Sequence, residues 1–194
     1  MKIRDLINFE KELAKEFEAG KIKFPVHLSG CTHYKQEKNL IKLFKKIKKT
    51  DYILSTWRNH YHWLLSGRDP FELKKQIRES GSMHVHDKSF ITSSIVGGIP
   101  PMALGLAYAL KRKKSKRHVW CFIGCMAYRC GITQECIRYA EGHNLPITFV
   151  VEDNDISVET RTRNVWGKKK TKKVIKYKYK RKYPHQGTGK WVLF

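Results

Sequence analysis

Residues 91–154 decide the fold, and they read ITSSIVGGIPPMALGLAYALKRKKSKRHVWCFIGCMAYRCGITQECIRYAEGHNLPITFVVEDN. The order is a small-residue loop, a helix, a basic turn, an apolar strand, a glycine-containing loop, a second helix and a second apolar strand with an acidic and amide tip. This pattern predicts a strand–helix–strand unit with polar residues at the carboxyl end of each strand. In open parallel sheets, ligands bind just outside those strand ends.

The composition is that of a folded globular protein. The chain has 194 residues, of which 41% are hydrophobic and 12% aromatic, enough for one domain with a core. No apolar run approaches the ~18 residues that a membrane-spanning helix needs. The N-terminal stretch MKIRDLINFEKELAKEF contains acids and no apolar signal core, so the sequence predicts a cytoplasmic protein.

Charge and cysteine usage limit the function classes. The net charge of +23 permits binding to nucleic acid, anionic surfaces or an acidic protein, but a solvated basic surface explains it equally well. The odd cysteine count argues against a secreted disulfide scaffold. Four cysteines follow the spacing C-x3-C-x4-C-x5-C, which lacks the C-x2-C pairs of structural zinc sites. We therefore expect buried free thiols at Cys31, Cys121, Cys125, Cys130 and Cys136.

Hydrophobic periodicity extends the strand–helix pattern to the whole chain. It predicts helices over residues 3–19, 35–49, 61–65, 70–80, 100–110 and 131–142, and strands over 52–55, 118–124, 145–154 and 174–183. The near-continuous apolar run of 145–154 is typical of an interior parallel strand. The predicted fold is α/β, a mostly parallel sheet flanked by helices. We expect one domain over residues 1–194, with a helical lead-in over about 1–50 and a basic C-terminal strand region over about 166–194.

Short motifs then arrive in a specific order. They are Trp57-Arg58-Asn59-His60, Gly81-Ser82-Met83-His84, Ser94-Ile95-Val96-Gly97, Gly124-Cys125-Met126, Gly131 to Glu135, Leu145 to Phe149 and Glu152-Asp153-Asn154. This ordered set resembles the alpha subunit of the decarboxylating (first) component of 2-oxo acid dehydrogenase complexes, which uses thiamine diphosphate. The separation of 29 residues between Cys125 and Asn154 fits that family's cofactor motif. The resemblance implies a thiamine diphosphate-binding fold, here in a short and divergent form.

The resemblance also implies roles for particular residues. Trp57 and Arg58 would contact the diphosphate, and the main chain at Ser94 and Val96 would line the aminopyrimidine. The remaining cofactor contacts would come from Gly124, Cys125, Met126, Ala127, Asn154 and Ile156. A magnesium site would be formed by position 125, Asn154 and the carbonyl of Ile156, because Mg²⁺ takes hard oxygen ligands. By their chemistry, His60, His84 and His86 are candidate proton-handling groups, and the alternative is that each only orders a loop. The resemblance implies that His185 stands where the family's later cofactor-facing histidine stands, so His60 and His185 are the candidate catalytic residues.

Three departures from the family pattern stand out. Cys125 replaces the family's aspartate, and a soft thiol is a poor ligand for magnesium. We hypothesise that Asp153 and Asp155 compensate for the lost carboxylate. Ser94 replaces a glycine. Only residues 155–173 separate the strand that ends in Asn154 from the basic strand region, where the family has further strand–helix units.

The family's alpha subunit works with a second chain. The resemblance implies that the glutamate which activates the cofactor comes from a beta-type partner, so the active site would lie at an interface within a larger oligomer. The first functional hypothesis is therefore a thiamine diphosphate-binding alpha-type subunit that takes part in oxidative decarboxylation of a 2-oxo acid. The second is a catalytically decayed member whose basic surface binds nucleic acid or an acidic partner. A third retains a softer metal at Cys125.

Overall fold

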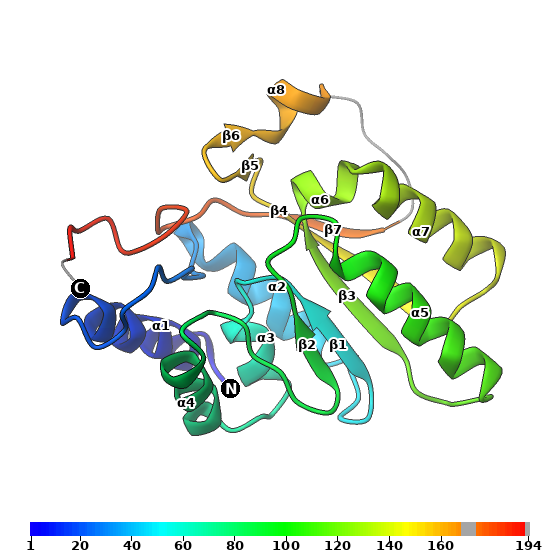
Figure 1. Cartoon of the computed structure of the whole chain (residues 1–194), viewed down its shortest axis with the longest axis horizontal. Helices are drawn as coiled ribbons and strands as arrows, with labels where there is room; N and C mark the ends of the chain where they lie inside the picture. The colour runs from blue at the N-terminus through cyan, green and yellow to red at the C-terminus, as the bar shows by residue number, and fades with distance from the viewer. Residues whose placement is uncertain (168–173, 193–194) are drawn as a thin grey trace. The chain divides into compact units, whose positions relative to one another are not determined.

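The computed structural model describes residues 1–167 and 174–192, and the chain divides into two compact units (Figure 1). The helical unit comprises residues 1–49, 57–85 and 179–194, and the sheet unit comprises residues 50–56 and 86–178. Both units are assembled from separated segments of the chain. The single domain expected over residues 1–194 stays a prediction.

The sheet unit is built on five parallel strands. In chain order these are β1 (Tyr52–Ser55), β2 (Phe90–Thr92), β3 (Val119–Gly124), β4 (Ile147–Asp153) and β7 (Ile175–Lys178). Their order in the sheet is β2-β1-β3-β4-β7, and every neighbouring pair is parallel. The predicted α/β class with a mostly parallel sheet is confirmed, and β4 has the interior position that its apolar run indicates.

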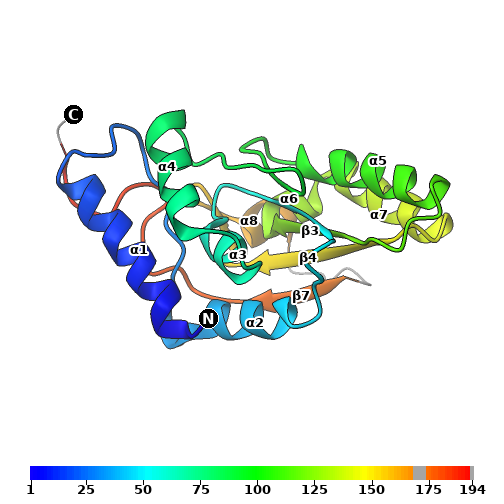
Figure 2. The same cartoon turned by 90° about the horizontal axis from the view of Figure 1, so that it is seen from below.

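Two helices, α5 (Ile99–Arg112) and α7 (Gly131–Gly142), lie side by side on one face of this sheet (Figure 2). The alternation of strand side chains sends Val119, Cys121 and Ile123 of β3 into the core beneath them. Small residues let α5 approach closely, since Ala103 and Ala107 are fully buried. A close-packed apolar layer thus lies between these two helices and this face of the sheet.

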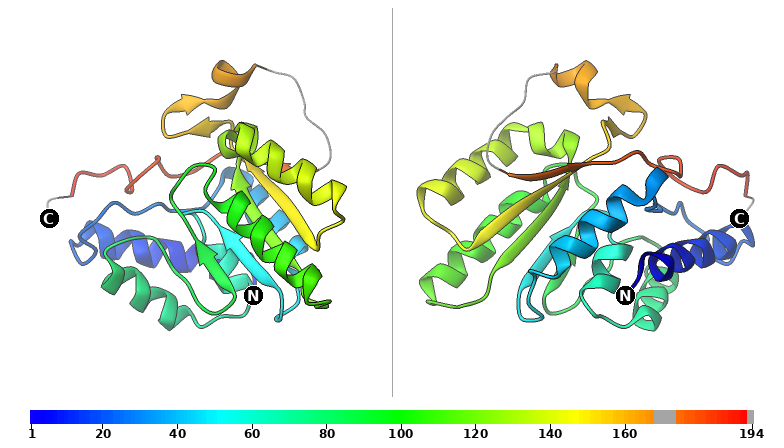
Figure 3. Two further views of the ribbon diagram at one scale, coloured as in Figure 1. Left: turned by 45° about the vertical axis from the view of Figure 1, so that its right-hand side comes forward. Right: turned by 180° about the vertical axis from the view of Figure 1, so that it is seen from behind.

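Short elements follow the carboxyl ends of β3 and β4. Helix α6 (Cys125–Arg129) begins directly after β3. After β4 come the two-residue strands β5 (Ile156–Ser157) and β6 (Thr160–Arg161), which form an antiparallel pair, and the helix α8 (Thr162–Trp166). In Figure 3, β5, β6 and α8 lie beyond the carboxyl end of β4, and β5 and α8 contact α6. Hydrophobic periodicity did not predict any of these elements, because each is shorter than two helical turns or a typical strand.

The helical unit contains α1 (Ile3–Glu18), the 3-10 turn η1 (Thr32–Tyr34), α2 (Lys35–Phe44), α3 (His60–Leu65) and α4 (Pro70–Ser80). Helix α2 ends at Phe44, earlier than predicted. Ion pairs join α1 to α4, with Lys74 Nζ 2.5 Å from Glu12 Oε2 and Arg78 NH2 2.8 Å from Glu16 Oε1.

Two observations complete the description. None of the helices in residues 1–167 and 174–192 has the length and apolar character needed to cross a bilayer. The predicted strand over 174–183 is observed as β7, and residues 168–173 of the basic C-terminal region lie outside the described residues.

Candidate functional site

The carboxyl ends of β3 and β4 form one edge of the sheet. Gly124 is paired with Glu152 in the parallel register, so the residues that follow these two strands emerge side by side. The Cys125 Sγ atom lies 3.7 Å from the Asn154 Oδ1 atom. The structure therefore brings together two of the residues that the resemblance assigns to the cofactor.

The Cys125 thiol is buried next to the polar side chains of Asn154 and Thr162 in the sheet unit. Its side chain is only 3% exposed, and its Sγ atom is 3.0 Å from the Thr162 Oγ1 atom at the start of α8. Burial raises the pKa of this thiol, the hydrogen bond with Thr162 lowers it in part, and the negative charge of Asp153 raises it again, so that the net shift is upward. Cys125 is consequently a neutral thiol at pH 7 rather than a thiolate.

Asp153 supplies the carboxylate at this edge. Its Oδ1 atom accepts a hydrogen bond of 2.9 Å from the backbone N–H of Asp155, and its Oδ2 atom lies 3.0 Å from the Lys176 ammonium on β7. Burial alone would raise the pKa of Asp153, but the hydrogen bonds from Lys176 and Asp155 outweigh it and lower that pKa. The group is an ionised carboxylate with a fixed cationic partner.

These side chains do not fit a magnesium ion. The Asn154 Oδ1 atom already accepts from the backbone N–H of Ile156 at 3.2 Å, and the thiol of Cys125 replaces a hard oxygen ligand. Within the described part of the chain, no group of three or more His, Cys, Asp or Glu side chains could hold a metal. The residues present therefore do not support a chemical step that depends on magnesium.

Gly124, by contrast, suits the close approach of a ligand. Its φ of −74° and ψ of 163° are extended values that any residue adopts, so the backbone does not require glycine here. A Cβ atom added at Gly124 would meet no heavy atom within 4 Å. The glycine leaves open space at the end of β3. Next to it, Met126 Sδ accepts from Trp166 Nε1 at 3.2 Å, and Ala127 packs into the apolar core.

The loop between β2 and α5 presents two apolar side chains. Ile95 is 71% exposed and Val96 is 58% exposed, whereas Ser94 is half-buried. The loop is held by a hydrogen bond from Gly98 N–H to the Ile95 carbonyl at 3.0 Å. Gly97 has a φ of +81°, a conformation that favours glycine. The conformation of this loop therefore holds Ile95 and Val96 at the surface.

In the helical unit, two predicted site residues meet. The Arg58 guanidinium donates to the carbonyl of His185 at 2.7 Å and to the carbonyl of Leu28 at 3.3 Å. Trp57 donates its indole N–H to the His84 Nε2 atom at 2.6 Å. The structure therefore joins Arg58 to the His185 backbone and orients Trp57 through His84.

Three histidines of the helical unit, His27, His60 and His62, are buried. His60 is fully buried, with its Nδ1 atom 2.7 Å from Glu10 Oε1 and its Nε2 atom 3.0 Å from Met83 Sδ. These contacts order the core, and a proton-handling role for His60 stays a prediction. Beside His185, burial lowers the pKa of His27 to about 4, so the neutral ring donates its Nδ1–H to the His185 carbonyl at 2.8 Å.

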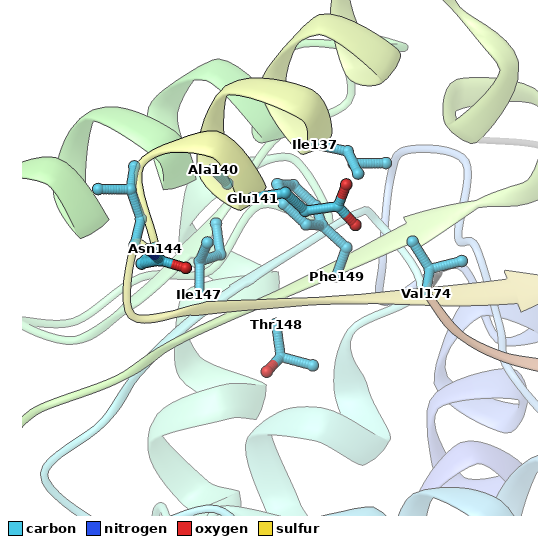
Figure 4. A pocket seen from close by; sticks show the side chains of 9 residues that line it. Ile137, Ala140, Glu141, Asn144, Ile147, Thr148, Phe149 and Val174 are labelled. Atoms are coloured by element: carbon cyan, nitrogen blue, oxygen red, sulfur yellow. The ribbon is translucent and has the colours of Figure 1, made fainter. Parts of the chain in front are cut away.

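A separate cavity of about 320 Å³ lies at the other end of β4 (Figure 4). Ile147 and Phe149 of β4 point toward α7, which contributes Ile137, Ala140 and Glu141 to the lining. Because these residues lie at the amino end of β4, the cavity is remote from Asn154. No residue that the resemblance assigns to the cofactor lines it.

Sequence reasoning missed two side chains of the site. Thr162 contacts Cys125, and Lys176 pairs with Asp153. The alternating pattern of VIKYKYKRKY indicates a strand with a basic face. It carries no signal for which lysine reaches β4, and nothing marked Thr162.

Comparisons of the chain with a family model and with curated proteins point to the same family. The model of the family described as dehydrogenase E1 component matches residues 1–177. The chain is 30% identical over 171 residues to the alpha subunit of acetoin:2,6-dichlorophenolindophenol oxidoreductase of Cupriavidus necator, covering 82% of this chain and 50% of that protein. It is 29% identical over 168 residues to the pyruvate dehydrogenase E1 component subunit alpha of Rickettsia prowazekii, covering 80% of this chain and 50% of that protein.

The chain thus spans about half the length of the curated relatives it matches. Among solved structures, a thiamin diphosphate-dependent enzyme from Mycobacterium smegmatis matches with a TM-score of 0.44 at 18% identity, covering 68% of this chain and 23% of that chain. The family match extends over most of the sequence, from the first helix to the last strand of the sheet, and it agrees with the resemblance drawn from the ordered motifs. The chain belongs to the dehydrogenase E1 component family.

Proposed function

We propose that this chain is an alpha-type subunit that binds thiamine diphosphate and takes part, with a beta-type partner, in the oxidative decarboxylation of a 2-oxo acid. The names of two relatives, a pyruvate dehydrogenase subunit and an acetoin oxidoreductase subunit, support an oxidoreductase of this class. Family membership favours this role over that of a nucleic-acid or scaffold protein.

The observation that carries the proposal is the edge formed by β3 and β4. Gly124 leaves open space at the end of β3, and Cys125 and Asn154 lie side by side just beyond it. Ligands of parallel sheets bind at the carboxyl ends of strands. This edge is therefore the place where the chain would take the diphosphate of the cofactor, with Gly124, Cys125, Met126, Ala127, Asn154 and Ile156 as its surroundings.

Bound thiamine diphosphate would supply the carbanion chemistry, and the protein would supply position and electrostatics. The neutral Cys125 thiol and the amide of Asn154 would offer polar contacts without adding negative charge next to the diphosphate. The family's Mg²⁺ remains a prediction of the resemblance that the present donor set supports poorly. Trp57, Arg58, Ser94 and Val96 are proposed cofactor contacts, and His60 and His185 are proposed proton-handling groups.

The proposal also includes the partner chain. Ile95 and Val96 project from the loop after β2, and Ile132 at the start of α7 is 47% exposed. A Cβ added at Gly97 would come within 3.2 Å of Ile132 Cγ2, so the loop and α7 are close neighbours. Apolar side chains grouped on a surface are typical of a protein interface. They are the proposed contact with a beta-type subunit.

We also propose a cytoplasmic location. All five cysteines are free thiols, as expected for a protein in a reducing compartment.

Calorimetric titration tests the proposal. Thiamine diphosphate is titrated into the full chain, with and without a candidate beta-type chain, and decarboxylation of pyruvate is followed in the mixture. We expect saturable cofactor binding, and 2-oxo acid turnover only when both chains are present. Absence of cofactor binding in both preparations would refute the proposed function.

A further inference from the structure

A lysine side chain brings a positive charge to the carboxyl ends of β3 and β4. The Lys176 Nζ atom lies 3.0 Å from the Asp153 Oδ2 atom, and the Cys125 Sγ atom lies 3.7 Å from Asn154 Oδ1, the residue next to Asp153. Lys176, Asp153 and Cys125 therefore form one contiguous group directly beside Gly124.

The charges of this group balance without a metal. An aspartate at position 125 would stand next to Asp153 and create two adjacent negative charges, which a divalent cation would neutralise. A thiol is uncharged at neutral pH, so the present group has only the negative charge of Asp153. The positive charge of Lys176 neutralises it. Because the Asp153–Lys176 pair and the Cys125 thiol together carry no net charge, no divalent cation is needed to neutralise carboxylates at this edge.

The other nearby carboxylate is engaged in the same way. The Asp155 Oδ2 atom lies 3.7 Å from Arg161 NH1 and 3.6 Å from Arg163 Nε. Asp153, the last residue of β4, and Asp155, two residues later, are therefore both paired with basic side chains. The hypothesis that Asp153 and Asp155 replace the lost magnesium ligand is not supported by this arrangement.

Lys176 is also placed to meet an anion. Its ammonium carries three N–H donors, and in the part of the chain that the structure describes Asp153 is its ion-pair partner. The Nζ atom is 5.9 Å from the centre of the Tyr128 ring, so the side chain reaches across to α6, the helix that starts after Gly124. Its side chain is 33% exposed. Lysine is an established phosphate ligand that acts as a point charge.

We propose that Lys176 takes the place of the divalent cation at this edge, so that the chain binds the diphosphate of its cofactor without Mg²⁺. This inference rests on the proposed function, because it concerns the same ligand at the same strand ends. It differs from that function in a measurable respect, the dependence of binding on a divalent metal.

Titration of thiamine diphosphate into the full chain, in EDTA and separately in excess Mg²⁺, tests the inference. Inorganic pyrophosphate serves as a second probe that carries only the diphosphate. We expect equal affinity in the two buffers. Affinity that appears only with Mg²⁺ would overturn the inference while leaving the proposed function in place, and no affinity in either buffer would overturn both.

Three variants sharpen the result. Lys176→Met should weaken binding in EDTA by roughly 10- to 100-fold, the loss expected for one charge-assisted hydrogen bond. Lys176→Arg should retain most of the affinity. The matched control Lys113→Met removes the same charge at the exposed end of α5 and should bind like the unmodified chain. Equal losses in Lys176→Met and Lys113→Met would indicate only a general effect of net charge and would overturn the inference.

Cys125→Asp gives the opposite test. It adds a second negative charge next to Asp153, so affinity in EDTA should fall and Mg²⁺ should restore it. If Cys125→Asp binds thiamine diphosphate in EDTA more tightly than the unmodified chain does, the inference that Lys176 replaces the divalent cation is overturned. Thermal unfolding of each variant, which does not involve the cofactor, shows whether the sheet unit is intact.

Discussion

Replacement of Gly124 by valine should impair ligand binding without destabilising the fold, so this variant tests the two separately. The backbone of Gly124 is extended, and an added Cβ would meet nothing within 4 Å, so the folded protein should accept the side chain. Losing a glycine also reduces the conformational entropy of the unfolded chain, and such changes stabilise proteins by about 0.4–1 kcal/mol where the backbone is compatible. We expect the unfolding temperature of Gly124→Val to stay the same or rise slightly.

Cofactor binding should respond in the opposite direction. The new side chain fills the space in which the diphosphate is proposed to lie, and overfilling a packed site costs about 1–3 kcal/mol, or roughly 5- to 150-fold in affinity. Calorimetry with thiamine diphosphate measures this loss. Gly105→Val is the matched control, because Gly105 in α5 also has no atom within 4 Å of an added Cβ. Undiminished affinity in Gly124→Val, together with a normal unfolding temperature, would refute the assignment of this edge to the cofactor.

Three further predictions concern the helical unit and the partner surface. Burial lowers the pKa of His27 from 6.5 to about 4, so the unfolded chain binds this proton at a higher pH than the folded chain, and the free energy of unfolding should fall as the pH drops from 6.5 toward 4. In denaturant unfolding at a series of pH values, His27→Asn should show a smaller decrease of the free energy of unfolding over this range. An equal decrease in the two proteins would contradict the lowered pKa of His27. Glu10→Ala removes the acceptor of the buried His60 Nδ1 and of the Ser29 N–H and should cost about 1–3 kcal/mol in the free energy of unfolding for each donor left unsatisfied, whereas Glu12→Ala, which breaks an exposed ion pair, should cost less than about 1 kcal/mol. Val96→Asp should leave the unfolding temperature unchanged but abolish co-purification with a beta-type chain, and retained association would remove this loop from the proposed interface.

The elements with strong local patterns could be predicted from the sequence. The run Tyr52–Ser55 is apolar and bounded by polar residues, and it forms β1 with the expected limits. Asp69 and Pro70 mark the start of α4, because the Asp69 side chain caps the helix by accepting from Phe71 N–H at 2.9 Å. β2 was missed, since its three residues follow a polar, histidine-rich segment and give no periodic signal.

In the candidate site, too, only the residues that follow elements with strong local patterns could be predicted. Cys125 and Asn154 follow two apolar strands joined by one helix, and neighbouring parallel strands end at the same edge, so their proximity follows from local patterns. Thr162 and Lys176 could not be found in this way. Thr162 is positioned by the segment that runs from Asp155, just before β5, through Val158 in the β5–β6 turn. Both residues adopt positive φ values, 58° and 54°, and although aspartate tolerates this conformation, the β-branched Val158 gives no signal for it. Lys176 depends on strand order and register, which a hydrophobic pattern does not encode.

The register of β7 is what selects Lys176, and two contacts on opposite faces of the sheet fix it. On one face the Tyr177 hydroxyl donates to the buried Glu152 carboxylate, and on the other Lys176 reaches Asp153. A shift of one residue would turn every β7 side chain to the opposite face. It would separate the Tyr177 hydroxyl from the buried Glu152 carboxylate and move the ammonium away from Asp153, and the loss of the Tyr177–Glu152 hydrogen bond alone would cost about 1 kcal/mol. Tyr177→Phe should therefore weaken not only the sheet but also the affinity for pyrophosphate, although Tyr177 faces away from Lys176. Calorimetry on Tyr177→Phe that finds pyrophosphate affinity unchanged would show that the position of Lys176 does not depend on this register contact.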